Sequence, residues 1–170
     1  LNIIIIEYKK YKIFQNINDE EINLFSERIK TKSYDENMII ISEGNSGDSI
    51  LFLLNGEISI TKALTLPIGE NSNSDVVEKE FGRLNSNQHI SFGENSLFSH
   101  DKKRTATVTA LTKCEIGFLD ETNFISICEA HYDVGYKVLK NLNEITTENL
   151  IKTNHQILKL TTAFSLLMDN

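Results

Sequence analysis

The pattern of hydrophobic and polar residues divides the chain into three regions, and the first reads as helical. Residues 8–31 place apolar side chains among charged ones, and Asn18 stands directly before an acidic turn at residues 19–21. A side-chain acceptor followed by acidic residues is typical of a helix start. We therefore predict a short amphipathic helix over about residues 19–30, within an N-terminal helical segment comprising residues 1–32.

The second region, residues 33–120, contains short runs rich in Ile, Val, Leu, Phe and Thr, separated by Gly, Asn, Asp and Ser. Asn55 and Gly56 lie between two such runs and predict a hairpin, because both residues accept a positive φ. Residues 43–48 predict a second turn. Short strands separated by turns are typical of a β-sandwich or barrel. The predicted strands cover residues 38–42, 50–54, 57–61, 76–81, 105–110 and 114–119.

Residues 66–75 have loop composition and interrupt the stretch 62–80. We predict an enlarged, mobile hairpin tip, which is either a tolerated insertion or a partner-binding loop.

The third region, residues 121–170, is helical again, with no Pro and a single Gly at position 135. Apolar residues there recur at a spacing of seven, and upstream the same stripe becomes polar. A long helix of this kind cannot bury its stripe on one small β-domain, so we predict that it pairs with a second copy of the chain as a homodimer. The apolar positions are Leu150, Ile157 and Phe164 with Leu160 and Leu167, and the polar ones are Asn143, Thr146 and Thr153.

Composition narrows the function classes. The 170 residues are 40% apolar and 24% charged, which is typical of a globular domain, and the net charge of −7 argues against direct nucleic-acid binding. Cys114 and Cys128 are too few for a disulfide framework, which favours a cytoplasmic location. The apolar run at residues 3–6 is too short to span a membrane. No catalytic or metal-binding motif is present, so we expect neither an enzyme nor a metal site.

The candidate chemistry lies in residues 91–110. Gly93 allows the backbone to turn before a short segment with helix-start composition, and Arg104 directly precedes a predicted strand. Unpaired N–H groups beside a guanidinium suit a phosphate. Glu94 suits a ligand that also offers hydroxyl donors, such as a ribose. Together these residues indicate a nucleotide site; the alternative is a surface ion pair between Glu94 and Arg104 worth about 0–1 kcal/mol.

This stretch resembles the phosphate-binding cassette of the cyclic nucleotide-binding domain family. Phe92-Gly93-Glu94 matches its first motif, Asn95, Ser96 and Leu97 follow, and Arg104-Thr105-Ala106 matches its second. The six residues at 98–103 between the two motifs resemble the spacing of the bacterial catabolite-activator branch. Residues 39–49 and 54–58 are similar to two further turns of the family, so that the resemblance covers residues 11 to about 168.

The resemblance implies a mainly β fold with flanking helices. Its parts would be an eight-stranded β-jelly roll (a double-stranded β-helix of cupin type), an N-terminal helix and a long C-terminal helix. The implied site residues are Phe92, Gly93, Glu94, Asn95, Ser96, Arg104, Thr105 and Ala106.

The resemblance also implies roles for these residues. Glu94 would accept a hydrogen bond from the ribose 2′-OH, and Arg104 would pair with the exocyclic oxygens of a cyclic phosphate. Gly93, Ser96 and Thr105 would line the pocket. The turn residues Gly44, Gly47, Asp48 and Gly56 would be structural. Asn95 departs from the apolar residue usual in the family, and Gln88 departs from its usual Gly.

The expected ligand is cyclic AMP, with cyclic GMP second, since Thr105 is compatible with both bases. The polar helix residues Thr146, Thr147, Asn149 and Thr153 either contact the base or set the register of a helix pair. The predicted function is a cyclic nucleotide sensor that relays a helix movement to an output. The alternatives are the sensor part of a catabolite-activator-type transcription regulator, with its DNA-binding part beyond Asn170, and a degenerate scaffold that only dimerises.

Overall fold

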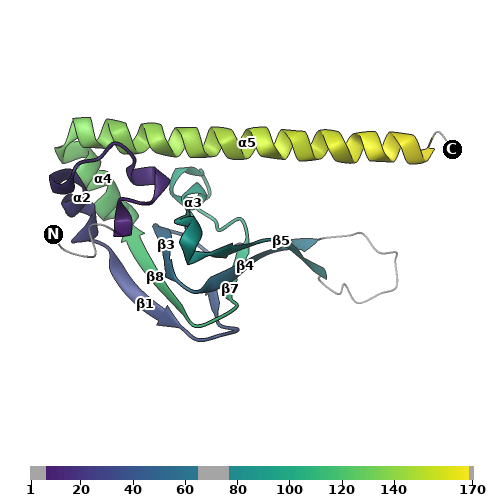
Figure 1. The fold of residues 1–170 in the computed structure, drawn as a ribbon, viewed down its shortest axis with the longest axis horizontal. Helices are drawn as coiled ribbons and strands as arrows, with labels where there is room; N and C mark the ends of the chain where they lie inside the picture. The colour runs from purple at the N-terminus through teal and green to yellow at the C-terminus, as the bar shows by residue number, and fades with distance from the viewer. Residues whose placement is uncertain (1–6, 65–76, 169–170) are drawn as a thin grey trace.

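The computed structural model describes residues 7–64 and 77–168 and contains eight strands in two four-stranded antiparallel sheets. The sheet orders are β1-β8-β3-β6 and β2-β7-β4-β5, which confirms the predicted mainly β fold with flanking helices (Figure 1). The strands are β1 (Lys30–Tyr34), β2 (Ile39–Ile41), β3 (Ser49–Asn55), β4 (Glu57–Leu64), β5 (Val77–Asn85), β6 (Ser91–Phe92), β7 (Thr107–Ala110) and β8 (Cys114–Asp120). The helices are η1 (Lys12–Phe14), α2 (Asp19–Ser26), η2 (Ser86–Gln88), α3 (Asn95–Phe98), α4 (Glu121–Ala130) and α5 (Tyr132–Met168).

The N-terminal helix α2 starts where the sequence predicts and ends earlier. Asn18 and Glu21 form a reciprocal capping box, in which each side chain accepts from the other residue's backbone N–H at 2.9 Å. The predicted extension to residue 30 is wrong, because the chain leaves the helix after Ser26 and enters β1 at Lys30. The predicted hairpin tip at residues 66–75 lies outside the described residues.

Strand β3 explains how one domain contains two hydrophobic clusters. Its side chains alternate between the two faces of the sheet, and both faces are covered. Ile50 and Phe52 pack against the helices, whereas Leu51 and Leu53 point between the two sheets. Strand β3 therefore joins the helical layer to the interior of the jelly roll.

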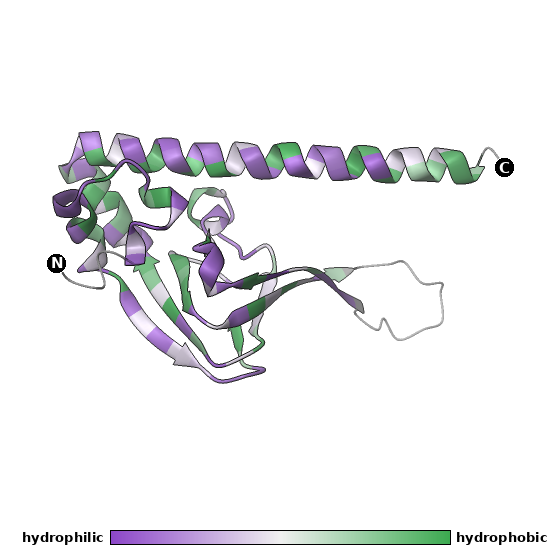
Figure 2. Ribbon diagram, in the orientation of Figure 1, coloured by the Kyte–Doolittle hydropathy of each residue, from purple (hydrophilic) through white to green (hydrophobic). Residues whose placement is uncertain are grey.

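Helix α5 is anchored at one end only. Its first turns bury Val134, Val138 and Leu142, and the Asn141 side chain donates to the carbonyl oxygens of Ile13 (3.0 Å) and Gln15 (2.8 Å). From residue 146 to residue 168 every α5 side chain is exposed, and the helix runs past the jelly roll (Figures 1 and 2). Neither α5 nor any other described helix combines the length and apolar character needed to cross a membrane.

Candidate functional site

The backbone of Arg104 is fixed by the turn that precedes β3. Its N–H donates to the carbonyl oxygen of Asn45 at 2.8 Å, and its own carbonyl accepts from the N–H of Gly44 at 2.9 Å. A third bond, from the N–H of Gly47 to the carbonyl oxygen of Lys102 at 2.8 Å, ties the same two segments together. Residues 43–48, which the sequence marks as a turn, therefore hold the loop from which Arg104 projects.

The Arg104 guanidinium is buried, with 9% of the residue exposed, and its described partners are all neutral. Nη1 donates to the carbonyl oxygens of Ser49 (3.0 Å) and Gly93 (2.8 Å) and to Ser96 Oγ (2.9 Å), and Nη2 donates to Ser49 Oγ (3.0 Å). Ser96 Oγ in turn donates to the Gly93 carbonyl at 2.8 Å. Among the described residues, no carboxylate oxygen lies within 4.0 Å of this cation.

Two glycines allow the backbone to approach the guanidinium. A Cβ atom at Gly47 would lie 2.2 Å from Arg104 Nε, and one at Gly93 would lie 2.5 Å from Nη1. Gly93 also has φ +83°, a conformation that strains any residue with a side chain. Gly47 thus shapes the site as well as the turn, a role that sequence reasoning did not assign to it.

Burial shifts both charged groups of the site toward their neutral forms. Desolvation lowers the pKa of Arg104, and the nearby charges of Asp48 and Glu94 only partly oppose it. Desolvation also raises the pKa of Glu94, against the opposing effects of a backbone hydrogen bond and of Arg104. Each group therefore lacks a partner that compensates for its partial removal from water.

A cavity of about 540 Å³ opens beside these two groups. Apolar residues of the strands line it, together with residues 92–95 and 104–106 and two exposed residues of α5. Seven of the eight predicted site residues line it. Ser96 does not line it, because it is 1% exposed and lies beneath Arg104 as a hydrogen-bond acceptor. The other lining residues are Ile41, Ile60, Phe81, Leu84, Ile90, Ser91, Val108, Asn149 and Lys152.

Helix α5 brings two polar residues to the lining of this cavity. Of the four candidates from the sequence, only Asn149 lines it. The Thr146 and Thr153 hydroxyls instead donate at 2.9 Å to carbonyl oxygens one helical turn earlier. Lys152 was not predicted, although its position three residues after Asn149 places it on the same face of a helix.

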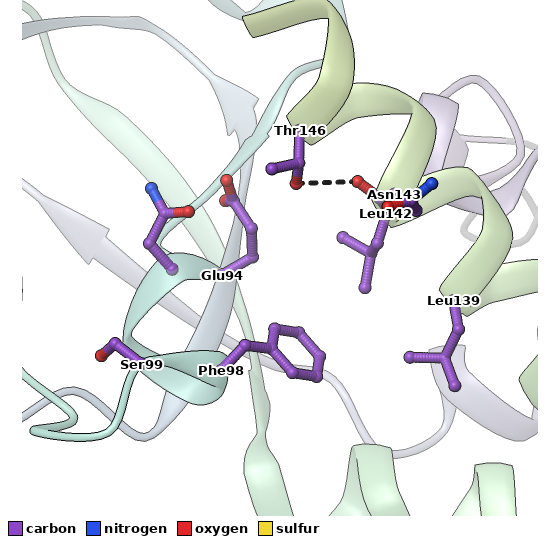
Figure 3. Close-up of a pocket in the computed structure, with 8 residues that line it drawn as sticks. Glu94, Phe98, Ser99, Leu139, Leu142, Asn143 and Thr146 are labelled. Carbon is purple, nitrogen blue, oxygen red and sulfur yellow. Dashed lines mark hydrogen bonds between the residues drawn. The ribbon is translucent and has the colours of Figure 1, made fainter. Parts of the chain in front are cut away.

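A second cavity, of about 450 Å³, separates α3 from α5. Figure 3 shows Phe98 reaching from α3 toward Leu139 and Leu142 of α5, while the Glu94 carboxyl points toward the α5 turn that carries Thr146. Glu94 and its neighbour Asn95 line both cavities. They form the wall between the interior of the jelly roll and the long helix.

Metal-binding side chains are not gathered anywhere in the described part of the chain: no three His, Cys, Asp or Glu residues there could share an ion. Cys114 and Cys128 are both buried free thiols. Burial, with a smaller contribution from Glu129, raises the pKa of Cys128 to about 11, so this thiol stays protonated near neutral pH.

Comparison with known proteins identifies the family to which the β-domain and its site belong. Residues 31–131, more than half of the chain, match the family model described as the cyclic nucleotide-binding domain. A cGMP-dependent protein kinase from Plasmodium berghei (strain Anka) is 30% identical over 151 residues, which cover 84% of this chain and 16% of the kinase.

Solved structures share the fold. The Thermus thermophilus catabolite activator protein superposes with a TM-score of 0.72 at 17% identity, covering 88% of this chain and 63% of that protein. A structure described as cAMP-bound PfPKA-R superposes with a TM-score of 0.59 at 28% identity, covering 73% of this chain and 40% of the other. The chain thus spans less than two thirds of each of these three proteins.

Proposed function

Because the chain belongs to the cyclic nucleotide-binding domain family, we propose that it binds a purine 3′,5′-cyclic nucleotide in the 540 Å³ cavity and relays binding to α5. One similar protein is described as a cGMP-dependent protein kinase and another as a cAMP-bound protein, so the proposed ligand is cyclic AMP or cyclic GMP. The role is regulatory rather than catalytic.

The observation that carries the proposal is the environment of Arg104. The acceptors of this buried cation are two carbonyl oxygens and two hydroxyl groups, all of them neutral. These hydrogen bonds orient the guanidinium, but no negative charge compensates its positive charge. A cyclic phosphate carries one negative charge on two exocyclic oxygens, which match the planar donor fork of a guanidinium. The phosphate thus compensates a charge that the protein leaves without a carboxylate partner.

Glu94 completes the polar end of the cavity. An ionised carboxylate only accepts hydrogen bonds, so beside a phosphate it requires a ligand group that donates them. The ribose 2′-OH is such a donor. Desolvation raises the pKa of Glu94 because it disfavours the charged carboxylate. A ligand hydroxyl that donates to this carboxylate would stabilise the charged form, which is an interaction that the free protein lacks.

The wall between the two cavities gives the proposed relay a physical route. A nucleotide that draws Glu94 toward its ribose acts on the start of α3, since Glu94 directly precedes that helix. Helix α3 faces α5 across the second cavity through Phe98 and Leu139. A shift of α3 therefore changes the packing against α5 and favours one position of the long helix over another.

The exposed end of α5 favours a second copy of the chain as a partner. The five heptad positions predicted from the sequence are all more than half exposed, from 55% at Ile157 to 75% at Leu167. Paired helices would bury these side chains in a coiled-coil seam. A dimerising scaffold without a ligand is the competing function. The presence of Arg104, together with Gly47 and Gly93 whose lack of a side chain makes room for its guanidinium, favours a binding site instead.

The test is a titration of the protein with cyclic AMP, cyclic GMP and, as a control, the open-ring nucleotide 5′-AMP, followed by calorimetry and thermal unfolding. We expect saturable binding of a cyclic nucleotide and a raised melting temperature, with much weaker binding of 5′-AMP. No response to either cyclic nucleotide at millimolar concentration would overturn the proposal.

A further inference from the structure

Helix α5 brings an exposed lysine to the lining of the cavity. Asn149 and Lys152 both line it, and neither side chain has a hydrogen-bond or ion-pair partner among residues 7–64 and 77–168. Glu148, the acidic residue one turn before Lys152, is paired with Lys12, which lowers its pKa most, and the charge of Lys152 adds a smaller lowering. No carboxylate oxygen of the described residues lies within 4.0 Å of the Lys152 ammonium, so this group can donate to a ligand.

The arrangement of the cavity determines which part of a nucleotide reaches this ammonium. Arg104 and Glu94 hold the phosphate and ribose at one end, which is the step that rests on the proposed function. The base then occupies the remaining space, bordered by Phe81 and Ile90 from the jelly roll and by α5. Lys152 and Asn149 are the polar residues that α5 contributes to that space.

We propose that Lys152 selects guanine over adenine and that the preferred ligand is cyclic GMP. A lysine ammonium has three donors and no acceptor. The N7–O6 edge of guanine offers two acceptors, whereas the corresponding edge of adenine pairs the N7 acceptor with an N6 amino donor. Lys152 can therefore satisfy both groups of guanine, but with adenine it meets an amino group that it cannot pair with. The Asn149 amide, which has a donor and an acceptor, suits either base.

Thr105 offers a different basis for guanine preference, and the two can be separated. A Thr105 hydroxyl would recognise guanine through its 2-amino group, which hypoxanthine lacks. Lys152 would recognise O6 and N7, which hypoxanthine keeps. Cyclic IMP, the hypoxanthine nucleotide, is therefore the probe that distinguishes a Lys152 contact from a Thr105 contact.

The experiment measures dissociation constants for cyclic GMP, cyclic IMP and cyclic AMP by calorimetry, for the wild type and for Lys152→Met. Met keeps the length and helix propensity of the side chain and removes the charge. The same charge is removed in the control Lys159→Met, one of the exposed α5 residues outside the cavity lining. Because all three ligands carry the same cyclic phosphate, the ratio of their affinities cancels the general loss of positive charge.

We expect the wild type to bind cyclic GMP and cyclic IMP at least about fivefold more tightly than cyclic AMP, the lower end of discrimination by a well-formed base contact. Lys152→Met should bring the three affinities together, and Lys159→Met should leave the ratios unchanged. A preference for cyclic AMP, a ratio unchanged by Lys152→Met, or cyclic IMP behaving like cyclic AMP would each overturn the inference and leave the proposed function intact. Binding of none of the three would instead refute the proposed function.

Discussion

Replacing Arg104 by alanine is the most direct test of the phosphate site. The guanidinium is already held by four hydrogen bonds, so binding does not have to order it, and the contact should contribute fully to affinity. A charge-assisted pair is worth about 1.5–3 kcal/mol, and a central value of about 2 kcal/mol corresponds to a roughly 30-fold weaker affinity.

The effect can be measured as a ligand-induced shift in thermal unfolding. With ligand at 100 times the wild-type Kd, binding stabilises the wild type by about 2.7 kcal/mol, whereas a 30-fold weaker variant gains only about 0.9 kcal/mol. For a chain of this length those values correspond to shifts of roughly 5–11 °C and 2–4 °C. The quantity to compare is the shift and not the absolute Tm, because alanine also removes a donor from Ser49 and Ser96 in the free protein.

The control is Lys103→Ala, which removes the same charge from an exposed neighbouring position. It should keep the wild-type shift, and Arg104→Lys should fall between the two because an ammonium keeps the charge without the planar fork. Equal shifts for Arg104→Ala and the wild type would refute the assignment of Arg104 to the phosphate.

Three further outcomes follow from the same geometry. Gly47→Ala should displace the Arg104 guanidinium and weaken nucleotide binding measured by calorimetry. Gly82→Ala is the control and should leave binding unchanged, because its Cβ meets no atom within 4 Å. Equal affinities of the two variants would contradict the close approach of the Gly47 backbone to Arg104. Nucleotide affinity should fall as the pH decreases through the raised pKa of Glu94, and the fall should start above the pH at which an ordinary Glu becomes protonated. Glu94→Gln should remove this pH dependence. In the free protein, the same pKa shift contributes stability at pH values below the ordinary Glu pKa, and this contribution is lost as the pH rises through the raised pKa. Leu160→Asp should convert a dimer into a monomer in light scattering without changing the helix content, and a wild type that is monomeric with and without ligand would exclude pairing through α5.

The sequence predicted the elements whose local pattern matches their burial. The strand after the 43–48 turn and the hairpin at Asn55 and Gly56 both lie where the apolar runs and turn residues place them. Strand β1 (Lys30–Tyr34) was not predicted, because Tyr34 is its only buried side chain and the other four carry no apolar alternation. Strand β6 (Ser91–Phe92) has two residues, too few to show any period.

In the site as well, sequence reasoning found the features that lie close together in the chain and missed those that depend on packing. Only six residues, 98–103, separate the glycine-bearing motif from the arginine in the sequence, and the structure brings the two together. The partners of Arg104 could not be found in that way, because the Ser49 contact joins residues 55 positions apart. Lys152 lines the cavity only because α5 packs beside the jelly roll, and neighbouring residues in the sequence do not specify that packing.

The distribution of polarity along α5 links ligand binding to the proposed dimer. The helix is anchored at Asn141, borders the cavity at Asn149 and Lys152, and carries its exposed heptad positions from Leu150 to Leu167. From the anchor to Met168 it extends 27 residues, or about 40 Å at the α-helical rise. A tilt of about 5° about this anchor therefore moves the far end sideways by roughly 3–4 Å, which is a large fraction of the roughly 8–10 Å that separates the axes of two packed helices. Such a seam has discrete packed registers, so a small displacement caused by the nucleotide favours one arrangement of the two copies over another.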